Sequence, residues 1–325
     1  MPNHTDIFCK VCKKNEFRFL FKNNDRMHHL AGEFDLYRCR ACGLVIYRPL
    51  LTQEALASYY PKDYYSYQAA EISGSGPARG ANYYLCHPLQ AVNALFYSKI
   101  LGQNRDLPFK PGQTVMDVGC GDGRYLLQEN KKDCRIYGVD IDGDALKKIK
   151  ALKPSAQVFC GNLWEAGFDA DFFDAIHLSH VVEHIEEVDR LLGEVARIIR
   201  SEGIVKLQIP NTASFTRVVF GPFWIHWDTP RHIYGFSRSS FLQLTSASGL
   251  EIVSSRTMEN SFSILGSLLY LFNAMTGKKI KLTKASRFWD SEILKIIFFP
   301  YCFLINFFGA GDTVEFILKK KNKVS

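Results

Sequence analysis

The sequence predicts an α/β protein built on a doubly wound, mostly parallel sheet of seven strands, with a small cysteine-bearing module ahead of it. Three observations carry this prediction. Strand-like and helix-like patterns alternate from residue 113 onward, a glycine-rich turn follows the first of these strands, and two C-x-x-C pairs lie within the first 50 residues. The 325 residues, 47% hydrophobic and 14% aromatic, can bury the core of one large domain and an appended module.

The module comes first. Two C-x-x-C pairs are separated by 26 residues and consist of Cys9, Cys12, Cys39 and Cys42. Two such pairs, known as zinc knuckles, supply four soft thiolates that can coordinate one Zn²⁺ tetrahedrally, which makes a closed structural site. We therefore predict a zinc ribbon over residues 1–50 that serves folding or docking. The first residues carry charge and cysteine where a secretory signal needs an apolar run, so the sequence favours a cytoplasmic, reducing compartment.

Residues 51–110 form the second segment, which is rich in tyrosine and broken by a glycine- and serine-rich stretch at 73–80. Such a stretch is typical of a flexible linker or the hinge of a lid. Apolar residues recur at helical spacing from 81 to 101, so we expect a helix that leads into the main domain.

The main domain is expected at 111–325. Its strands are predicted at 113–119, 135–140, 156–160, 172–179, 203–210, 251–258 and 312–320, and its helices near 124–131 and at 144–152, 188–200 and 239–248. Ligands of such sheets bind at the carboxyl ends of the strands. Two insertions, 211–236 and 259–311, interrupt the alternation, and the second is expected to be helical.

The turn after the first strand places a carboxylate beside backbone that a ligand can approach closely. Asp117 ends the strand, and Gly119 and Gly121 follow it. A dinucleotide fingerprint needs a further glycine three residues after Gly121, where Arg124 stands, so we do not expect a dinucleotide. A carboxylate at this lip suits an ammonium group and would repel a pyrophosphate.

The next two strands end in further candidate ligand-binding residues. Asp140 ends the second strand, where an acid can accept both hydroxyls of a ribose. Ile141 would flank an adenine ring, and Asn162 and Leu163, in the turn after the third strand, can read the adenine edge.

At this point a family resemblance is plain. The motifs D-V-G-C-G-D-G, V-D-I-D, D-x-I-x-L-S-H-V-V-E-H-I and I-P-N resemble class I S-adenosylmethionine-dependent methyltransferases, in the broad group that includes the ubiquinone-biosynthesis O-methyltransferases. The resemblance is close over 113–210 and loose elsewhere. Two further segments, CRACGLVIYRPLLTQEALASYYPKDYY and TPRHIYGFS, resemble parts of bacterial methyltransferases that often accompany polysaccharide or cell-surface glycan synthesis.

The resemblance implies a Rossmann-like sheet whose seventh strand is antiparallel, and S-adenosyl-L-methionine as the cofactor. It implies that Asp117, Gly119 and Gly121 cradle the methionine part, that Asp140 binds the ribose, and that the Asn162 region binds the adenine. We include His180, after the fourth strand, among the cofactor-binding candidates.

Methyl transfer to a hydroxyl requires an aligned nucleophile and a base that removes its proton. The candidate bases are His180, His184 and His232, with Glu183 as a carboxylate that orients them. Glu183 and His184 could also hold a divalent ion, but two ligands do not make a site.

The two insertions each leave an alternative open. Phe223, Trp224 and Trp227 could form an aromatic wall over an acceptor, with Arg231 and His232 as polar contacts, or they could be core. The apolar runs 262–272 and 293–308 are too short or too interrupted for a membrane span. Together with the basic C-terminus, they could instead lie on an anionic membrane surface, or form a buried helical hairpin.

Three functions remain open from the sequence. The leading hypothesis is O-methylation of a small molecule, or of a cell-surface glycan or lipid-linked precursor. An RNA methyltransferase that grips its substrate through the zinc ribbon is less favoured, because LSHV stands where base N-methyltransferases carry Asn/Asp-Pro-Pro-aromatic, and nucleic acid is not an expected partner. A non-catalytic scaffold is the third.

Overall fold

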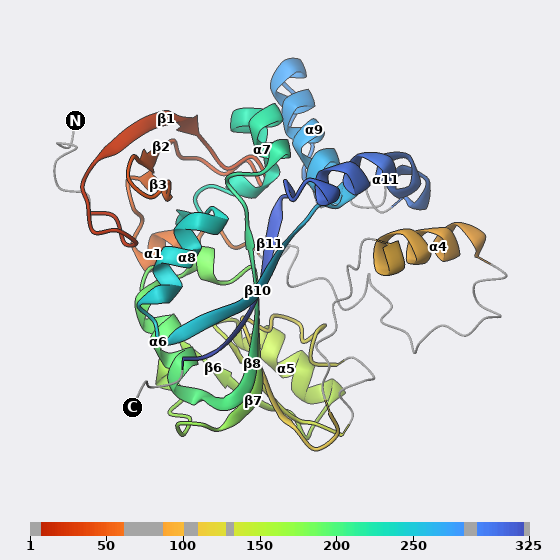
Figure 1. Ribbon diagram of the computed structural model, residues 1–325. Helices are drawn as coiled ribbons and strands as arrows, with labels where there is room; N and C mark the ends of the chain where they lie inside the picture. Colours follow the sequence, from red (N-terminus) through yellow and green to blue (C-terminus); the bar gives the residue numbers. More distant parts are fainter. Residues whose placement is uncertain (1–7, 62–86, 101–109, 128–132, 283–290, 322–325) are drawn as a thin grey trace.

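The computed structural model describes residues 8–61, 87–100, 110–127, 133–282 and 291–321. Its main sheet has seven strands in the order β10-β11-β8-β7-β4-β5-β6 (Figure 1). The strands are β4 (Thr114–Val118), β5 (Arg135–Asp140), β6 (Gln157–Cys160), β7 (Phe173–Ser179), β8 (Ile199–Pro210), β10 (Leu250–Met258) and β11 (Thr313–Lys320).

The direction of the strands matches the prediction. The pairs from β8 through β7, β4 and β5 to β6 are parallel. β11 runs antiparallel to both of its neighbours, β8 and β10. The predicted Rossmann-like sheet of seven strands with an antiparallel last strand is therefore confirmed.

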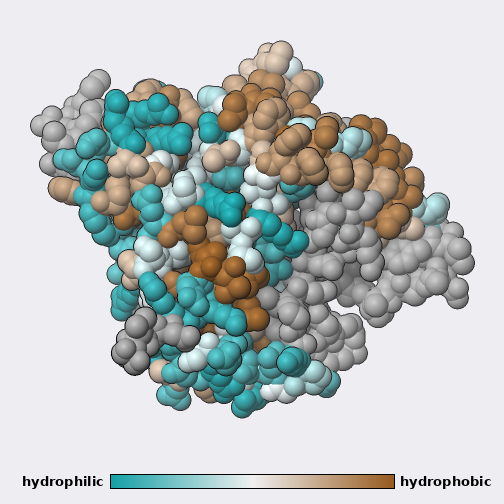
Figure 2. All heavy atoms as spheres, in the orientation of Figure 1, coloured by the Kyte–Doolittle hydropathy of each residue, from teal (hydrophilic) through white to brown (hydrophobic). Residues whose placement is uncertain are grey.

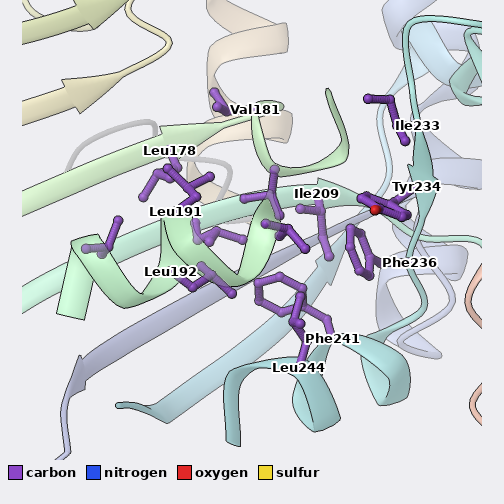
Figure 3. Packing of buried hydrophobic residues seen from close by; sticks show 14 of the residues in the cluster. Leu178, Val181, Leu191, Leu192, Ile209, Ile233, Tyr234, Phe236, Phe241 and Leu244 are labelled. Carbon is purple, nitrogen blue, oxygen red and sulfur yellow. The ribbon is translucent and has the colours of Figure 1, made fainter. Parts of the chain in front are cut away.

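Successive side chains of a strand point to opposite faces of the sheet, and the central strands are apolar on both faces. Helices therefore cover both faces. α5 (Gly143–Leu152) buries Leu146 and Ile149 against one face, beside Val115 of β4. α6 (Val188–Ile198) and α8 (Arg238–Ser246) cover the other face. Figure 3 shows their leucines and Phe241 packed against Ile209 of β8.

Some helix boundaries differ from the prediction. α6 ends at Ile198 because β8 already begins at Ile199, two residues before the predicted end of the helix. Residues 124–127 form a turn, and the remainder of the helix expected near 124–131 lies outside the described residues. The helix expected at 81–101 is seen as α4 (Pro88–Asn93), followed by a π-helical stretch, Ala94–Ile100. Residues 62–86, with the predicted hinge, lie outside the described residues.

The N-terminal module contains a second, antiparallel sheet. Its strands are β1 (Phe17–Asn23), β2 (Phe34–Cys39), β3 (Val45–Arg48) and β9 (Tyr234–Gly235), and a short helix, α1 (Gln53–Ala57), follows β3. β9 belongs to the predicted insertion 211–236, so this insertion supplies one edge of the N-terminal sheet. One continuous hydrophobic cluster contains residues of both sheets, which joins the module to the main domain.

The described parts of the insertions also contain α7 (Phe215–Phe220), α9 (Ser261–Thr276) and α11 (Glu292–Phe307). α9 buries Leu265, Leu269 and Tyr270, whereas α11 fully buries only Cys302 and Ile305. A buried hairpin is therefore the wrong description of α11, which lies half exposed. Within the described part of the chain, no helix is long and apolar enough to cross a membrane.

Candidate functional site

A cavity of about 930 Å³ opens at the carboxyl ends of β4, β5, β6 and β7. This is the size of a small-molecule site, and it lies where sheets of this kind bind their ligands. The glycine turn, Asp140, Ile141, Asn162 and Leu163 line one side. The candidate histidines His180, His184 and His232 line the other, so the cavity joins both predicted sets of residues.

Only glycine can occupy position 119, the first glycine of the turn after β4. Gly119 has a φ of +68°, and a Cβ there would lie 2.4 Å from Cγ2 of Val181. Gly121 has a φ of +51°, and its N–H donates to Oδ2 of Asp140 at 2.7 Å. The backbone is thereby exposed to the cavity at close range.

Asp117 lies at the base of this turn, held by a histidine that the sequence analysis missed. Oδ1 of Asp117 lies 2.8 Å from Nδ1 of His177, and both side chains are buried. The ring of Tyr125 stacks on His177 with centroids 3.6 Å apart. His177 is the register partner of Asp117 across β4 and β7. His177 could therefore have been predicted by aligning the ends of the first and fourth predicted strands, because these strands are neighbours in the sheet.

Asp140 is partly engaged with the backbone. Its carboxylate accepts the N–H groups of Gly121 and Asp142, and a carboxylate has capacity for further donors. Burial raises the pKa of Asp140, while these two N–H groups oppose that shift. Ile141 beside it is 67% exposed and presents an apolar side chain at the rim.

Asn162 is the N-cap of the short 3-10 helix Leu163–Glu165, which follows β6 close to Asp140. The N–H of Asn162 donates to Oε2 of Glu165 at 2.8 Å, and its amide donates to Oε1 of the same residue. Leu163 is buried, yet it also lines the cavity. This capping arrangement fixes the turn that was predicted to face an adenine ring.

On the opposite side, His180 and Glu183 form a pair. Nδ1 of His180 lies 3.1 Å from Oε1 of Glu183, which is fully buried. Burial alone would raise the pKa of Glu183, but His180, His232 and His184 lower it to about 2. His180 adopts a φ of +55°, and its N–H donates to the carbonyl of Gln208. Such backbone strain in a non-glycine residue is concentrated at functional sites.

His184 and His232 lie next to this pair, with ring centroids 4.5 Å apart. Nδ1 of His184 lies 3.0 Å from the carbonyl oxygen of Arg231 and 2.9 Å from the hydroxyl of Tyr60. Nδ1 of His232 lies 2.8 Å from the carbonyl oxygen of His226. Burial and the neighbouring His232 lower the pKa of His184 to about 4, so His184 is neutral at pH 7.

His226 also lines the cavity and was not among the predicted residues. Its Nε2 lies 2.9 Å from Oγ of Ser263, and its ring stacks parallel to that of His180 at 6.0 Å. Burial, followed by His180 and His232, lowers the pKa of His226 to about 3. The sequence signal was present in the run Phe223-Trp-Ile-His-Trp, but only the aromatic residues of that run were considered.

The aromatic wall does not form. Trp224 and Trp227 are buried in the core, and neither they nor Phe223 line the cavity. The indole of Trp224 donates to Asp312 instead. Arg231 is likewise no acceptor contact, because it is fully buried and pairs with two carboxylates, those of Asp25 and Asp228.

The four predicted cysteines come together in the N-terminal module. Their Sγ atoms all lie within 4.8 Å of one another, with 3.4 Å between Cys9 and Cys42 and 3.5 Å between Cys12 and Cys39. Four sulfurs around one Zn²⁺ with bonds of about 2.3 Å lie roughly 3.8 Å apart, so the group fits a tetrahedral ion. The Cys42 thiol lowers the pKa of Cys9 to about 5, and burial opposes that shift.

Comparison with known proteins agrees with this geometry. A family model described as a methyltransferase domain matches residues 87–255. A probable S-adenosylmethionine-dependent methyltransferase of Mycolicibacterium smegmatis is 24% identical over 143 residues, which are 43% of this chain and 53% of that protein. The (+)-O-methylkolavelool synthase of Herpetosiphon aurantiacus is 28% identical over 151 residues, 42% of this chain and 53% of that protein.

The chain thus spans about half the length of the curated relatives it matches. Among solved structures, a SAM-dependent methyltransferase from Archaeoglobus fulgidus is similar over 73% of this chain and 99% of that one, with a TM-score of 0.43 and 19% identity.

Proposed function

The chain belongs to the methyltransferase domain family, and on that premise we propose that it transfers the methyl group of S-adenosylmethionine to a hydroxyl group. The acceptor that we propose is a small molecule or a cell-surface glycan or lipid-linked precursor. One observation carries the proposal: a single cavity joins the glycine turn and Asp140 to a cluster of histidines. A relative named for an O-methyl product supports the hydroxyl as acceptor.

The cofactor would lie along the first side of the cavity. Asp117 offers a carboxylate to the ammonium of its methionine part, and the backbone of Gly119 and Gly121 allows close approach. The lone pairs of Asp140 that its two backbone donors leave open can accept ribose hydroxyls. Ile141 can cover one face of the adenine ring.

His180 is the base that we propose. Glu183 can only accept a hydrogen bond when ionised, so Nδ1 of His180 carries the proton and Nε2 keeps a lone pair. His180 also has 32% of its side chain exposed, whereas Glu183 is fully buried. Glu183 therefore orients the ring, and His180 faces the ligand.

The chemical step is an in-line displacement. The acceptor oxygen attacks the sulfonium methyl carbon, an O–CH₃ bond forms as the S–CH₃ bond breaks, and the sulfur keeps the electron pair as a neutral thioether. The hydroxyl proton passes to Nε2 of His180.

The test is methyl transfer from labelled cofactor to extracts that contain glycans, lipid-linked precursors or quinol precursors. We expect His180→Gln to lower the rate by about 10²–10⁴-fold, as removal of a general base does, while S-adenosylhomocysteine still binds. An unchanged rate in this variant would exclude His180 as the base.

We further propose that the four cysteines hold a structural Zn²⁺. Their geometry and their thiolate chemistry support it, and a reducing compartment such as the cytoplasm would keep the thiols available. A closed set of four ligands leaves no position for substrate, so this ion would stabilise the module and take no part in the reaction.

Peripheral contact with an anionic membrane is the third part of the proposal. Figure 2 shows hydrophobic side chains gathered at the upper right, where α9 and α11 lie. The large exposed apolar side chains there are Phe262, Leu268, Phe272, Met275, Ile293, Ile297, Phe303, Leu304, Phe307 and Phe308. Lys278, Lys279 and Lys281 follow α9 directly. Apolar surface next to cationic side chains is typical of proteins that lie on anionic lipid.

A further inference from the structure

The N-terminal module supplies part of the cavity wall. Met27, in the loop between β1 and β2, and Tyr60, which follows α1, both line the cavity. The hydroxyl of Tyr60 lies 2.9 Å from Nδ1 of His184, so the module reaches the half of the cavity that holds the histidines. Met27 belongs to one hydrophobic cluster with Ile225, which also lines the cavity, and with Leu269 of α9. The module is therefore built into the acceptor half of the cavity.

A buried guanidinium joins the module to this half. Arg231 is fully buried, and its Nη2 donates to Oδ1 of Asp25 in the module and to Oδ1 of Asp228, both at 2.6 Å. Its Nη1 donates to the carbonyl of Tyr59, the residue before Tyr60, at 2.9 Å. The N–H groups of a guanidinium are fixed in one plane, so these contacts fix how the module and the insertion 211–236 meet.

Asp25 also fixes the loop that carries Met27. Its Oδ1 accepts the N–H of Met27 at 3.1 Å, and its Oδ2 accepts the N–H of Leu30 at 3.2 Å. On the other side of the ion pair, the carbonyl oxygen of Arg231 lies 3.0 Å from Nδ1 of His184. One buried ion pair thus connects the loop of Met27 to a histidine of the cavity.

His184 orients the hydroxyl of Tyr60. The carbonyl of Arg231 can only accept a hydrogen bond, so Nδ1 of His184 carries a proton, and the oxygen of Tyr60 accepts this proton as well. The O–H of Tyr60 then points away from His184. Because Tyr60 lines the cavity, a molecule bound there can receive a hydrogen bond from this hydroxyl.

We propose that Met27 and Tyr60 contact the methyl acceptor and determine which acceptor binds, and that Asp25 and Arg231 are positioning residues that hold them in place. The inference rests on the proposed function, because it assigns the acceptor to the half of the cavity that contains the histidines. A thioether and a phenol suit an acceptor that has an apolar face and, beside it, an oxygen that accepts from Tyr60.

The test measures transfer of labelled methyl groups by the full chain to the extract that the parent methylates most strongly, at a series of dilutions. We expect Tyr60→Phe and Met27→Ala to raise the amount of extract that gives the half-maximal rate by about threefold to tenfold, since each variant loses a contact with the acceptor. The maximal rate and the binding of S-adenosylhomocysteine should change less than about twofold.

Asp25→Asn tests the positioning role. The variant leaves Arg231 and Asp228 as a neutral buried pair, so no unpaired charge remains. It should raise the half-saturating amount of extract in the same way. Tyr37→Phe is the matched control, because it removes a tyrosine hydroxyl from β2 of the same module, at a position that does not line the cavity. It should leave the dependence on the extract unchanged.

An unchanged dependence on the extract in Tyr60→Phe and Met27→Ala would overturn the inference while the proposed function stands. Normal behaviour of Asp25→Asn would remove the positioning role. Loss of S-adenosylhomocysteine binding in all three variants would also overturn the inference, because the module would then support the whole fold and not the acceptor site. If the parent methylates no extract, the proposed function fails and the inference fails with it.

Discussion

At the scale of single residues, the glycine turn makes the strictest demand on the sequence. Gly119→Ala would combine a φ of +68° with a Cβ 2.4 Å from Val181. We expect it to lower the free energy of unfolding by about 1–3 kcal/mol, the usual cost of such strain. It should also weaken S-adenosylhomocysteine binding at least about tenfold, because the turn must move.

Gly193→Ala is the matched control. Gly193 lies within α6, has no atom within 4 Å of an added Cβ, and has no positive φ. Alanine there should stabilise the helix by about 0.5–1 kcal/mol and leave binding unchanged. Urea unfolding and calorimetry measure both effects. Equal behaviour of the two variants would contradict the account of the turn.

The site residues that follow from the order of the strands were the most readily predicted, whereas His232, in the insertion 211–236, was predicted from its residue type alone. Asp117, Gly119 and Asp140 follow strands of a recognisable order, so their meeting at one sheet edge was predictable. His226 and Asp228 depend on how an irregular insertion folds back over the sheet, and no local periodicity encodes that path.

At the scale of elements, the N-terminal sheet depends on the cysteine group. β2 ends at Cys39, and β3 begins three residues after Cys42, so an ion held there fixes the hairpin between these strands. We expect Cys39→Ser to lose the bound zinc and to speed amide hydrogen exchange in β1, β2 and β3. Exchange in the central strands of the main sheet should change little.

Cys160→Ser serves as the control, because Cys160 is exposed and lies outside the group. It should retain one equivalent of zinc and normal exchange. Slow exchange in β2 and β3 of the metal-free Cys39→Ser variant would show that the sheet forms without the ion.

Element prediction succeeded where hydrophobic patterns were long. All seven strands of the main sheet were expected near their observed positions, whereas β9, with only two residues, carries no pattern that could be read. The end of α6 was misplaced because Ile199 and Arg200 continue an apolar and polar alternation that suits either helix or strand.

At the scale of the whole molecule, one hydrophobic cluster joins the two sheets, and the most exposed apolar side chains gather on α9 and α11. Phe307 and Phe308 are each 73% exposed. We expect the full chain to float with vesicles of mixed phosphatidylglycerol and phosphatidylcholine. The double variant Phe307→Ser/Phe308→Ser should bind them at least about a hundredfold more weakly, since each buried ring contributes about 1.5–3 kcal/mol and each 1.4 kcal/mol is a factor of ten.

Val253→Ser is the control for this prediction, because Val253 is an exposed apolar residue of β10 rather than of α9 or α11. Binding should also weaken at high salt if the lysines contribute. Equal flotation of all three proteins, or none by the parent, would exclude this surface as the membrane contact.

The central claim is that the cavity binds S-adenosylmethionine, and calorimetric titration of S-adenosylhomocysteine into the zinc-loaded protein tests it most directly. The account predicts that the parent binds one equivalent and that Asp140→Ala binds none, because the variant removes the carboxylate that meets the ribose. Failure of the parent to bind would contradict the account and would make a non-catalytic scaffold the better description of the molecule.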